Sequence, residues 1–116
     1  FGAVGDRIGR ARTLTLTVRL EPALPDADRV VLTIDQFTGG QQTFEEVLTL
    51  AAADFDAERA AVRRLLLDPA TEFVELNAEA HQGPVIIGHT KASVTTFDAR
   101  DYELEVTIPP APPFQP

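Results

Sequence analysis

The chain has 116 residues, the length of a single domain, and its 44% hydrophobic and 24% charged residues are ordinary for a globular protein. With 18 acidic against 10 basic residues, the net charge is −8, so nucleic acid and anionic lipid are not expected partners. The chain has no cysteine, which excludes disulfides, thiolate zinc sites and cysteine nucleophiles. No apolar run is long enough to span a bilayer, so we expect no membrane insertion by this segment.

The composition divides the chain into three parts. Residues 1–11 are rich in glycine and arginine and are interpreted as an N-terminal arm or linker. Residues 12–109 are expected to form one domain, and the proline-rich residues 110–116 a tail or linker. The chain contains no methionine and begins at Phe1, so we expect a processed product or an excerpt of a longer protein.

Seven strands are predicted in chain order. Polar and apolar residues alternate without a break from Thr13 to Leu20, which is typical of a half-buried strand. The turns between strands are marked by Pro, Gly and Asp every 8 to 12 residues, a pattern typical of a β-sandwich or small barrel. The predicted strands cover residues 13–20, 29–37, 43–51, 62–67, 72–80, 85–96 and 102–108.

One segment has two interpretations. Residues 54–67 are good helix formers, with Asp54 as an N-cap and arginines near the end, which predicts a short helix at about 54–64. The alternation from Val62 to Leu67, followed by a turn, favours a strand there instead. The fold is therefore expected to be all-β, and the alternative is an α+β fold with one helix packed on an antiparallel sheet.

The residues able to carry chemistry are few. In the predicted hairpin with Leu76 opposite His89, the two histidines, His81 and His89, lie too far apart to share a metal. The acidic pair Asp54 and Asp56 lacks the glycine and spacing of a calcium loop, and a helix cap explains it better.

Paired carboxylates and a serine nucleophile are also disfavoured. The glutamates of the last predicted strands, Glu75, Glu79, Glu103 and Glu105, fall on outward faces, where solvation explains them better than catalysis. The single serine, Ser93, lies inside a predicted strand without a G-x-S-x-G motif. We therefore expect no catalytic, cofactor-binding or metal-ligating residues, no cofactor, and a protein that is not an enzyme.

The second half of the chain carries a family resemblance. Leu66-Leu67-Asp68-Pro69-Ala70-Thr71, the strand 73–80, Val85-Ile86-Ile87-Gly88 and the closing strand 103–108 follow one another in that order. This series resembles the Ig-like and transthyretin-like β-sandwich modules of bacterial secreted proteins and lipoproteins, over residues 64–108. The resemblance implies an antiparallel sandwich of about seven strands, an extracytoplasmic location and a scaffold, adhesion or assembly role. It implies no catalytic residues.

The expected function is that of a structural or interaction module of a surface protein or extracellular assembly. Its partner would be another protein or copies of itself, in a homo-oligomer or filament, contacted through the arms or a sheet edge. The arginines Arg7, Arg10, Arg12 and Arg19 make the N-terminal end basic, so an arm docking on an acidic surface is one interpretation and a solvated linker the other. Two alternatives are a virion structural or decoration protein and a glycan- or calcium-binding module.

Overall fold

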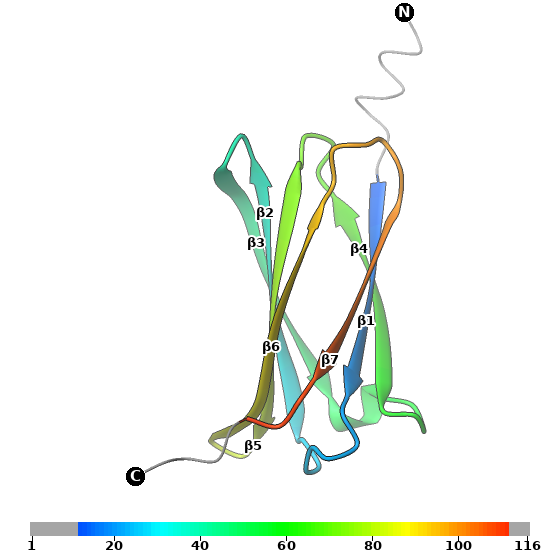
Figure 1. The fold of residues 1–116 in the computed structure, drawn as a ribbon, viewed down its shortest axis with the longest axis vertical. Coiled ribbons are helices and arrows are strands. Elements are labelled where there is room, and N and C mark those ends of the chain that lie inside the picture. The colour runs from blue at the N-terminus through cyan, green and yellow to red at the C-terminus, as the bar shows by residue number, and fades with distance from the viewer. Residues whose placement is uncertain (1–11, 112–116) are drawn as a thin grey trace, which may run out of the picture.

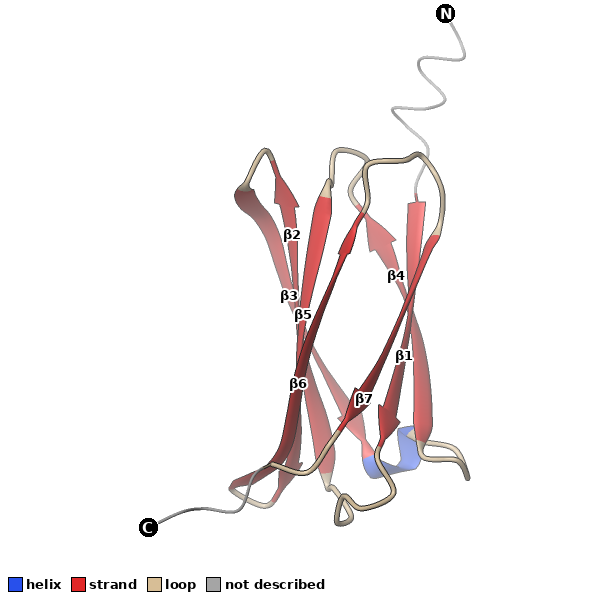
Figure 2. Cartoon of the chain, viewed as in Figure 1, coloured by secondary structure: helices blue, strands red, loops and turns tan. Residues whose placement is uncertain are grey.

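The computed structural model describes residues 12–111, and these form two β-sheets packed face to face (Figure 1). The expected all-β sandwich of seven strands is confirmed, and Figure 2 shows strands throughout with one short helical turn. The elements are β1 (Arg12–Leu20), β2 (Arg29–Thr38), β3 (Gln41–Ala51), the 3-10 turn η1 (Ala52–Asp54), β4 (Ala60–Leu67), β5 (Phe73–Gln82), β6 (Val85–Thr95) and β7 (Tyr102–Ile108).

The two sheets have the strand orders β4-β1-β7 and β3-β2-β5-β6. Neighbouring strands are antiparallel except β1 and β7, which run parallel with Leu14 opposite Tyr102. The β2–β3 hairpin turns through Gly39 and Gly40, whose positive φ angles of 60° and 80° suit a two-residue turn of this hand. The larger sheet therefore consists of two hairpins, β2–β3 and β5–β6, which pair through β2 and β5. The strands of the smaller sheet, β1, β4 and β7, come together from distant parts of the chain.

The core lies between the sheets and follows the alternation in the sequence. On β1 the residues Leu14, Leu16 and Val18 are buried, and the threonines between them are half-buried on the outer face. On β2 the inward residues Val30 and Leu32 are fully buried. Period-2 alternation puts one face of each strand against the opposite sheet, which is the main source of stability in such a fold.

The short helix expected at about 54–64 is not formed, and neither is the α+β alternative. The carboxylate of Asp56 accepts hydrogen bonds from the N–H groups of Glu58 and Ala60, at 2.8 and 3.0 Å, and so fixes a tight loop instead. Arg59 completes this loop with φ of 62°. The strand that follows pairs with β1 along its length, and that pairing outweighs the local helix propensity.

Arg12 is a structural residue of the sandwich rather than part of a basic arm. Its side chain is buried at the start of β1, and its guanidinium donates to five backbone carbonyls. These belong to the β4–β5 loop and to the loop that follows β6: Asp68, Pro69, Thr71, Thr96 and Asp98. One arginine therefore ties together two loops at the same end of the sandwich. The arm itself, residues 1–11, lies outside the described residues.

The two lateral sides of the sandwich differ. On one side β6 and β7 approach each other closely. The segment after β7 lies along the start of β6, where Pro110 forms an isolated β-bridge with Gly88 and the Ala111 N–H donates to Ile87 O at 2.8 Å. On the other side β3 and β4 lie farther apart (Figure 1). We call these the closed side and the open side.

Candidate interaction surface

The outer edge of β4 is one of the two sheet edges on the open side, and that of β3 is the other. Leu20 N–H donates to Arg59 O, so the odd-numbered residues of β4 point their backbone groups toward β1. The N–H and C=O groups of Val62, Arg64 and Leu66 therefore point away from the sheet. The start of β4 is already closed, because Asp56 N–H donates to Ala60 O at 2.9 Å.

Several of these outward groups have no partner. Val62 O accepts from the guanidinium of Arg63 at 2.9 Å, and Leu66 O accepts a long 3.5 Å contact from the Gln36 amide. Within residues 12–111, no hydrogen bond reaches the N–H of Val62, either backbone group of Arg64 or the N–H of Leu66. Such a row of free groups is a template for pairing with another strand.

The side chains along this edge are apolar at both ends. On the outer face of β4, Val62 is 55% exposed and Leu66 is 70% exposed, with the exposed Arg64 between them. Natural edge strands are usually shortened, bulged or charged against unwanted pairing. This one carries a single charge on its outer face, so its chemistry favours contact with a second apolar strand. We call residues 62–66 the β4 edge.

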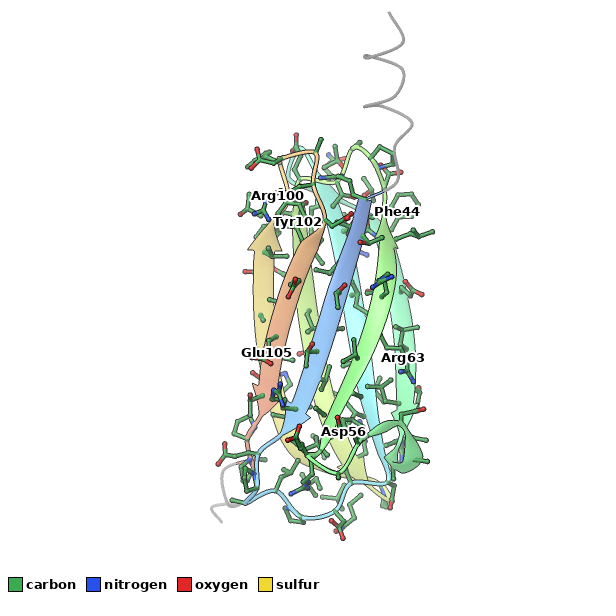
Figure 3. All side chains as sticks on the ribbon, turned by 90° about the vertical axis from the view of Figure 1, so that its right-hand side faces the viewer. Phe44, Asp56, Arg63, Arg100, Tyr102 and Glu105 are labelled. Carbon is green, nitrogen blue, oxygen red and sulfur yellow. The ribbon has the colours of Figure 1, made fainter. Side chains whose placement is uncertain are left out.

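The neighbouring strand β3 has different chemistry. Its residues Glu45 and Glu46 are exposed, and Phe44 is 51% exposed at the rim of a hollow of about 230 Å³ that Leu66 also lines. The open side is bridged by an ion pair of 3.1 Å between Asp54 and Arg63. Figure 3 shows Phe44 and Arg63 on this side and Asp56 near the start of β4.

The Asp54 carboxylate is held in its charged form. The Ala51 N–H donates to it at 2.7 Å, and this hydrogen bond lowers the pKa of Asp54, with a smaller contribution from Arg63. The acidic residues singled out for a helix cap therefore act in loops: Asp54 fixes the end of β3, and Asp56 fixes the start of β4. No group of three or more His, Cys, Asp or Glu side chains within residues 12–111 is arranged to hold a metal ion.

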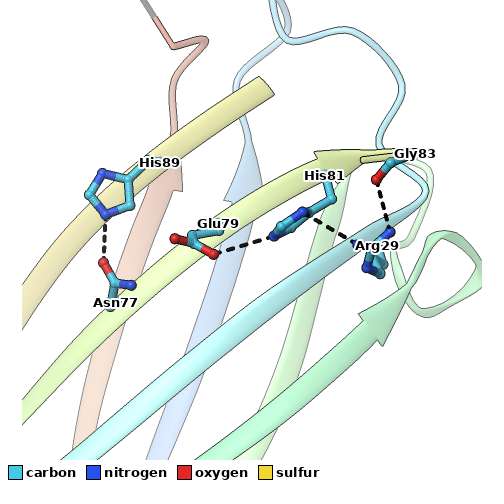
Figure 4. Close-up of polar contacts among 6 residues, drawn as sticks. All are labelled: Arg29, Asn77, Glu79, His81, Gly83 and His89. Atoms are coloured by element: carbon cyan, nitrogen blue, oxygen red, sulfur yellow. Dashed lines mark hydrogen bonds and ion pairs between the residues drawn. The ribbon is translucent and has the colours of Figure 1, made fainter. Parts of the chain in front are cut away.

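The two histidines have separate partners on the larger sheet (Figure 4). His89 Nε2 donates to Asn77 Oδ1, while His81 Nε2 donates to Glu79 Oε1 at 3.3 Å. The expected register, with Leu76 opposite His89, is wrong. Gln82 pairs with Val85 across a turn at Gly83 and Pro84, and a bulge after Ala80 adds a further one-residue shift, so His89 lies opposite Glu79.

The glutamates and the serine lie where the alternation predicts. Glu75 and Glu79 are on the outer face of β5, and Glu103 and Glu105 are exposed on β7, where Glu105 forms an ion pair with Arg19 at 2.8 Å. Ser93 lies on β6 directly opposite Glu75.

The carboxylates gather in a row that the sequence analysis did not find. Asp35 lies directly between Glu45 on β3 and Glu75 on β5. A hydrogen bond to Asp35 and the charge of Asp35 raise the pKa of Glu45. The three residues are far apart in sequence, so only the strand register reveals the row.

Comparisons with known proteins support the fold. No protein-family model matches the chain, and no characterised protein matches its sequence. One solved structure with a similar fold is an alternative pilotin from the type II secretion system of Vibrio cholerae, with a TM-score of 0.54 and 10% sequence identity. The match covers 88% of this chain and 98% of that one. No helix within the described residues is long and apolar enough to cross a membrane.

Proposed function

We propose that this protein is a non-enzymatic interaction module of an extracytoplasmic surface protein or assembly, and that it binds its partner by adding a strand to the β4 edge. The observation that carries the proposal is the row of unpaired, outward-pointing backbone groups between the exposed Val62 and Leu66. Main-chain hydrogen bonds supply affinity in this mode of binding, and side-chain matching supplies specificity. The similarity to a secretion-system pilotin supports an envelope location.

The side chains of the β4 edge define the partner strand. Across two paired strands, residues that lie opposite each other on one face interact, and like charges are unfavourable there. A partner strand should therefore place apolar residues near Val62 and Leu66 and an acidic residue near Arg64. Antiparallel pairing of two copies of β4 centred on Arg64 would put two arginines opposite each other. The edge thus favours a different strand over a second β4.

A peptide tests this proposal on the full chain. The probe is an eight-residue peptide in which valine, glutamate and leucine alternate with threonine, and the readout is amide hydrogen exchange by NMR. We expect slower exchange at Val62, Arg64 and Leu66 when the peptide is added, because their N–H groups become hydrogen-bonded. Unchanged exchange at these amides, with exchange slowed elsewhere, would rule out addition at the β4 edge.

A proline variant provides the matched test. The N–H of Arg64 points away from β1, so Arg64→Pro removes a donor that the sandwich does not use. We expect Arg64→Pro to fold, as judged by circular dichroism, and to lose peptide binding at least tenfold. The control Glu103→Gln, on the exposed face of β7, should bind as the unaltered chain does. Equal binding by Arg64→Pro would contradict the proposal.

A further inference from the structure

Two adjoining hollows lie on the outer face of the larger sheet, away from the β4 edge. One, of about 390 Å³, is aromatic; the other, of about 450 Å³, is polar and acidic, and both are lined by Glu75. The hollows form one continuous surface that we call the acidic–aromatic face. Its defining residues are Asp35, Phe37, Phe73, Glu75 and Phe97.

The aromatic part of this face is open to solvent. The rings of Phe37 and Phe73 have centroids 5.8 Å apart and are tilted by 59°, so they contact each other and leave a hollow beside them. Phe97, at the rim, is 71% exposed. Exposed aromatic side chains around a hollow are a common feature of binding surfaces, because covering them removes apolar area from water.

The acidic part carries charge that the fold does not neutralise. Glu45, Asp35 and Glu75 lie directly opposite one another on three adjacent strands, and such like-charged neighbours repel. Asp35 Oδ1 is shielded from solvent and accepts no hydrogen bond within residues 12–111. Lys91 lines the same hollow, yet it forms no ion pair in this part of the chain. A bound cation would relieve this repulsion.

The spacing of the two parts is set by the strands. Asp35 and Phe37 are two residues apart on β2, and Phe73 and Glu75 are two residues apart on β5, so each pair shares one face. Residues two apart along a strand are separated by about 6.6 Å. The same distance separates residues i and i+2 of any extended peptide. A peptide lying along these strands therefore places alternate side chains in the two hollows.

We propose that the acidic–aromatic face binds an extended segment of a protein partner in which a large apolar residue and an arginine or lysine are two residues apart. The apolar side chain would contact Phe37, Phe73 and Phe97, and the cationic one would contact Asp35 and Glu75. This inference goes beyond strand addition, because it uses side chains on the other sheet and no backbone edge.

Two synthetic peptides of identical composition test the spacing, with the full chain and isothermal titration calorimetry. Both are eight residues long and otherwise serine and threonine. One has phenylalanine and arginine two residues apart, and the other has them adjacent, so that they point to opposite sides of an extended peptide. We expect the first to bind at least fivefold more tightly. Equal affinity, or equal binding of free arginine amide, would overturn the proposal.

Matched variants test the location. Phe97→Ser and Glu75→Gln change exposed or half-exposed residues, and each should weaken the first peptide by about threefold to tenfold. The controls remove equivalent groups elsewhere: Leu66→Ser takes an exposed apolar residue from β4, and Glu103→Gln takes a carboxylate from β7. Controls that weaken binding as much as the test variants would refute this location. Leu66→Ser should instead impair strand addition, so the two proposals fail independently.

The chain's own arm is a competing occupant that the same assay identifies. Ile8 and Arg10, outside the described residues, have the proposed spacing of two. In the full chain, Arg10→Ser should leave the affinity for the first peptide unchanged if the face binds a partner. A higher affinity of Arg10→Ser for the first peptide would mean that the arm competes for the acidic–aromatic face, and it would overturn the assignment of this face to a partner.

Discussion

The closed and open sides of the sandwich differ in how the backbone groups at their sheet edges are hydrogen-bonded. Each side brings together the edges of two sheets, and each pair of edges has backbone groups to satisfy. On the closed side the segment after β7 covers one end of the β6 edge, since Pro110 forms a β-bridge with Gly88 and Ala111 N–H donates to Ile87 O. On the open side, one ion pair and the contacts of Gln36 span the gap, and within residues 12–111 the outward backbone groups of Arg64 have no hydrogen-bond partner.

The difference underlies the proposal that the open side binds a partner. A side covered by its own chain contributes to stability, and substitutions there should lower the free energy of unfolding. A side with unpaired edge groups contributes little to stability and more to recognition. Substitutions on the closed side should therefore change stability, and substitutions on the open side should change binding.

The largest effect is expected at the end where both sides meet. Arg12 joins the β4–β5 loop of the open side to the loop between β6 and β7 of the closed side. Arg12→Ala leaves several buried carbonyls without a donor and should lower the free energy of unfolding by about 4 kcal/mol. Urea unfolding followed by circular dichroism measures this loss. Arg64→Ala, an exposed arginine on β4, is the control and should change stability by less than about 0.5 kcal/mol.

The next effect tests the closed side alone. A Cβ atom at Gly88 would lie 2.6 Å from Pro109 O and 2.8 Å from a methyl carbon of Leu24. Gly88→Val should therefore displace the segment after β7 and cost about 3 kcal/mol of stability. Thermal unfolding measures the loss, and Thr90→Val, on the same face two residues later, is the near-isosteric control. Equal stability of the two variants would show that the closed side is not tightly packed.

Two adjacent leucines test the open side. Leu65 points into the core and Leu66 points out to solvent. Leu65→Ala should lower the free energy of unfolding by about 2 kcal/mol, because it creates a cavity. Leu66→Ala should leave stability within about 0.5 kcal/mol and weaken binding of the alternating valine, glutamate and leucine peptide several-fold. Denaturation and calorimetry on the same samples give both quantities. Loss of stability without loss of binding in Leu66→Ala would make β4 purely structural.

The sequence predicts the strands well and their neighbours poorly. The alternation of Thr13–Leu20 is local, so it predicts both the strand and its buried face. The segment 54–64 is mispredicted as a helix because its strand is selected by pairing with β1, about 45 residues earlier in the chain. The β4 edge follows from that same pairing and has no local pattern of its own.

The charged residues show the same limit. Arg12 belongs by composition to a basic N-terminal end, yet its partners lie 56 to 86 residues away in sequence. The row of Glu45, Asp35 and Glu75 depends on the register of three strands. Residue type predicts that such groups are charged. Whether a charged group finds hydrogen-bond partners, as Arg12 does, or faces like charges, as Asp35 does, depends on how distant parts of the chain pair.

The smallest effect concerns this acidic row, which begins on the edge strand β3 of the open side. The hydrogen bond and charge of Asp35 raise the pKa of Glu45 above its ordinary value of 4.5. The folded chain therefore keeps this proton to a higher pH than the unfolded chain does. The resulting contribution to stability is fully present below the unfolded pKa and is lost as pH rises through the folded pKa.

Asp35→Asn separates this repulsion from the rest of the fold. The pKa of Glu45, measured by NMR titration of its carboxyl carbon, should fall back toward its ordinary value. The stability of the variant relative to the unaltered chain should be greater at pH 7 than at pH 3, because the repulsion it removes exists only when both groups are ionised. Asp54, whose pKa is lowered by the Ala51 N–H, is the internal reference and should not shift. An unchanged Glu45 pKa would mean that Asp35 does not act on the edge strand, and the repulsion that favours a bound cation on the acidic–aromatic face would lose its support.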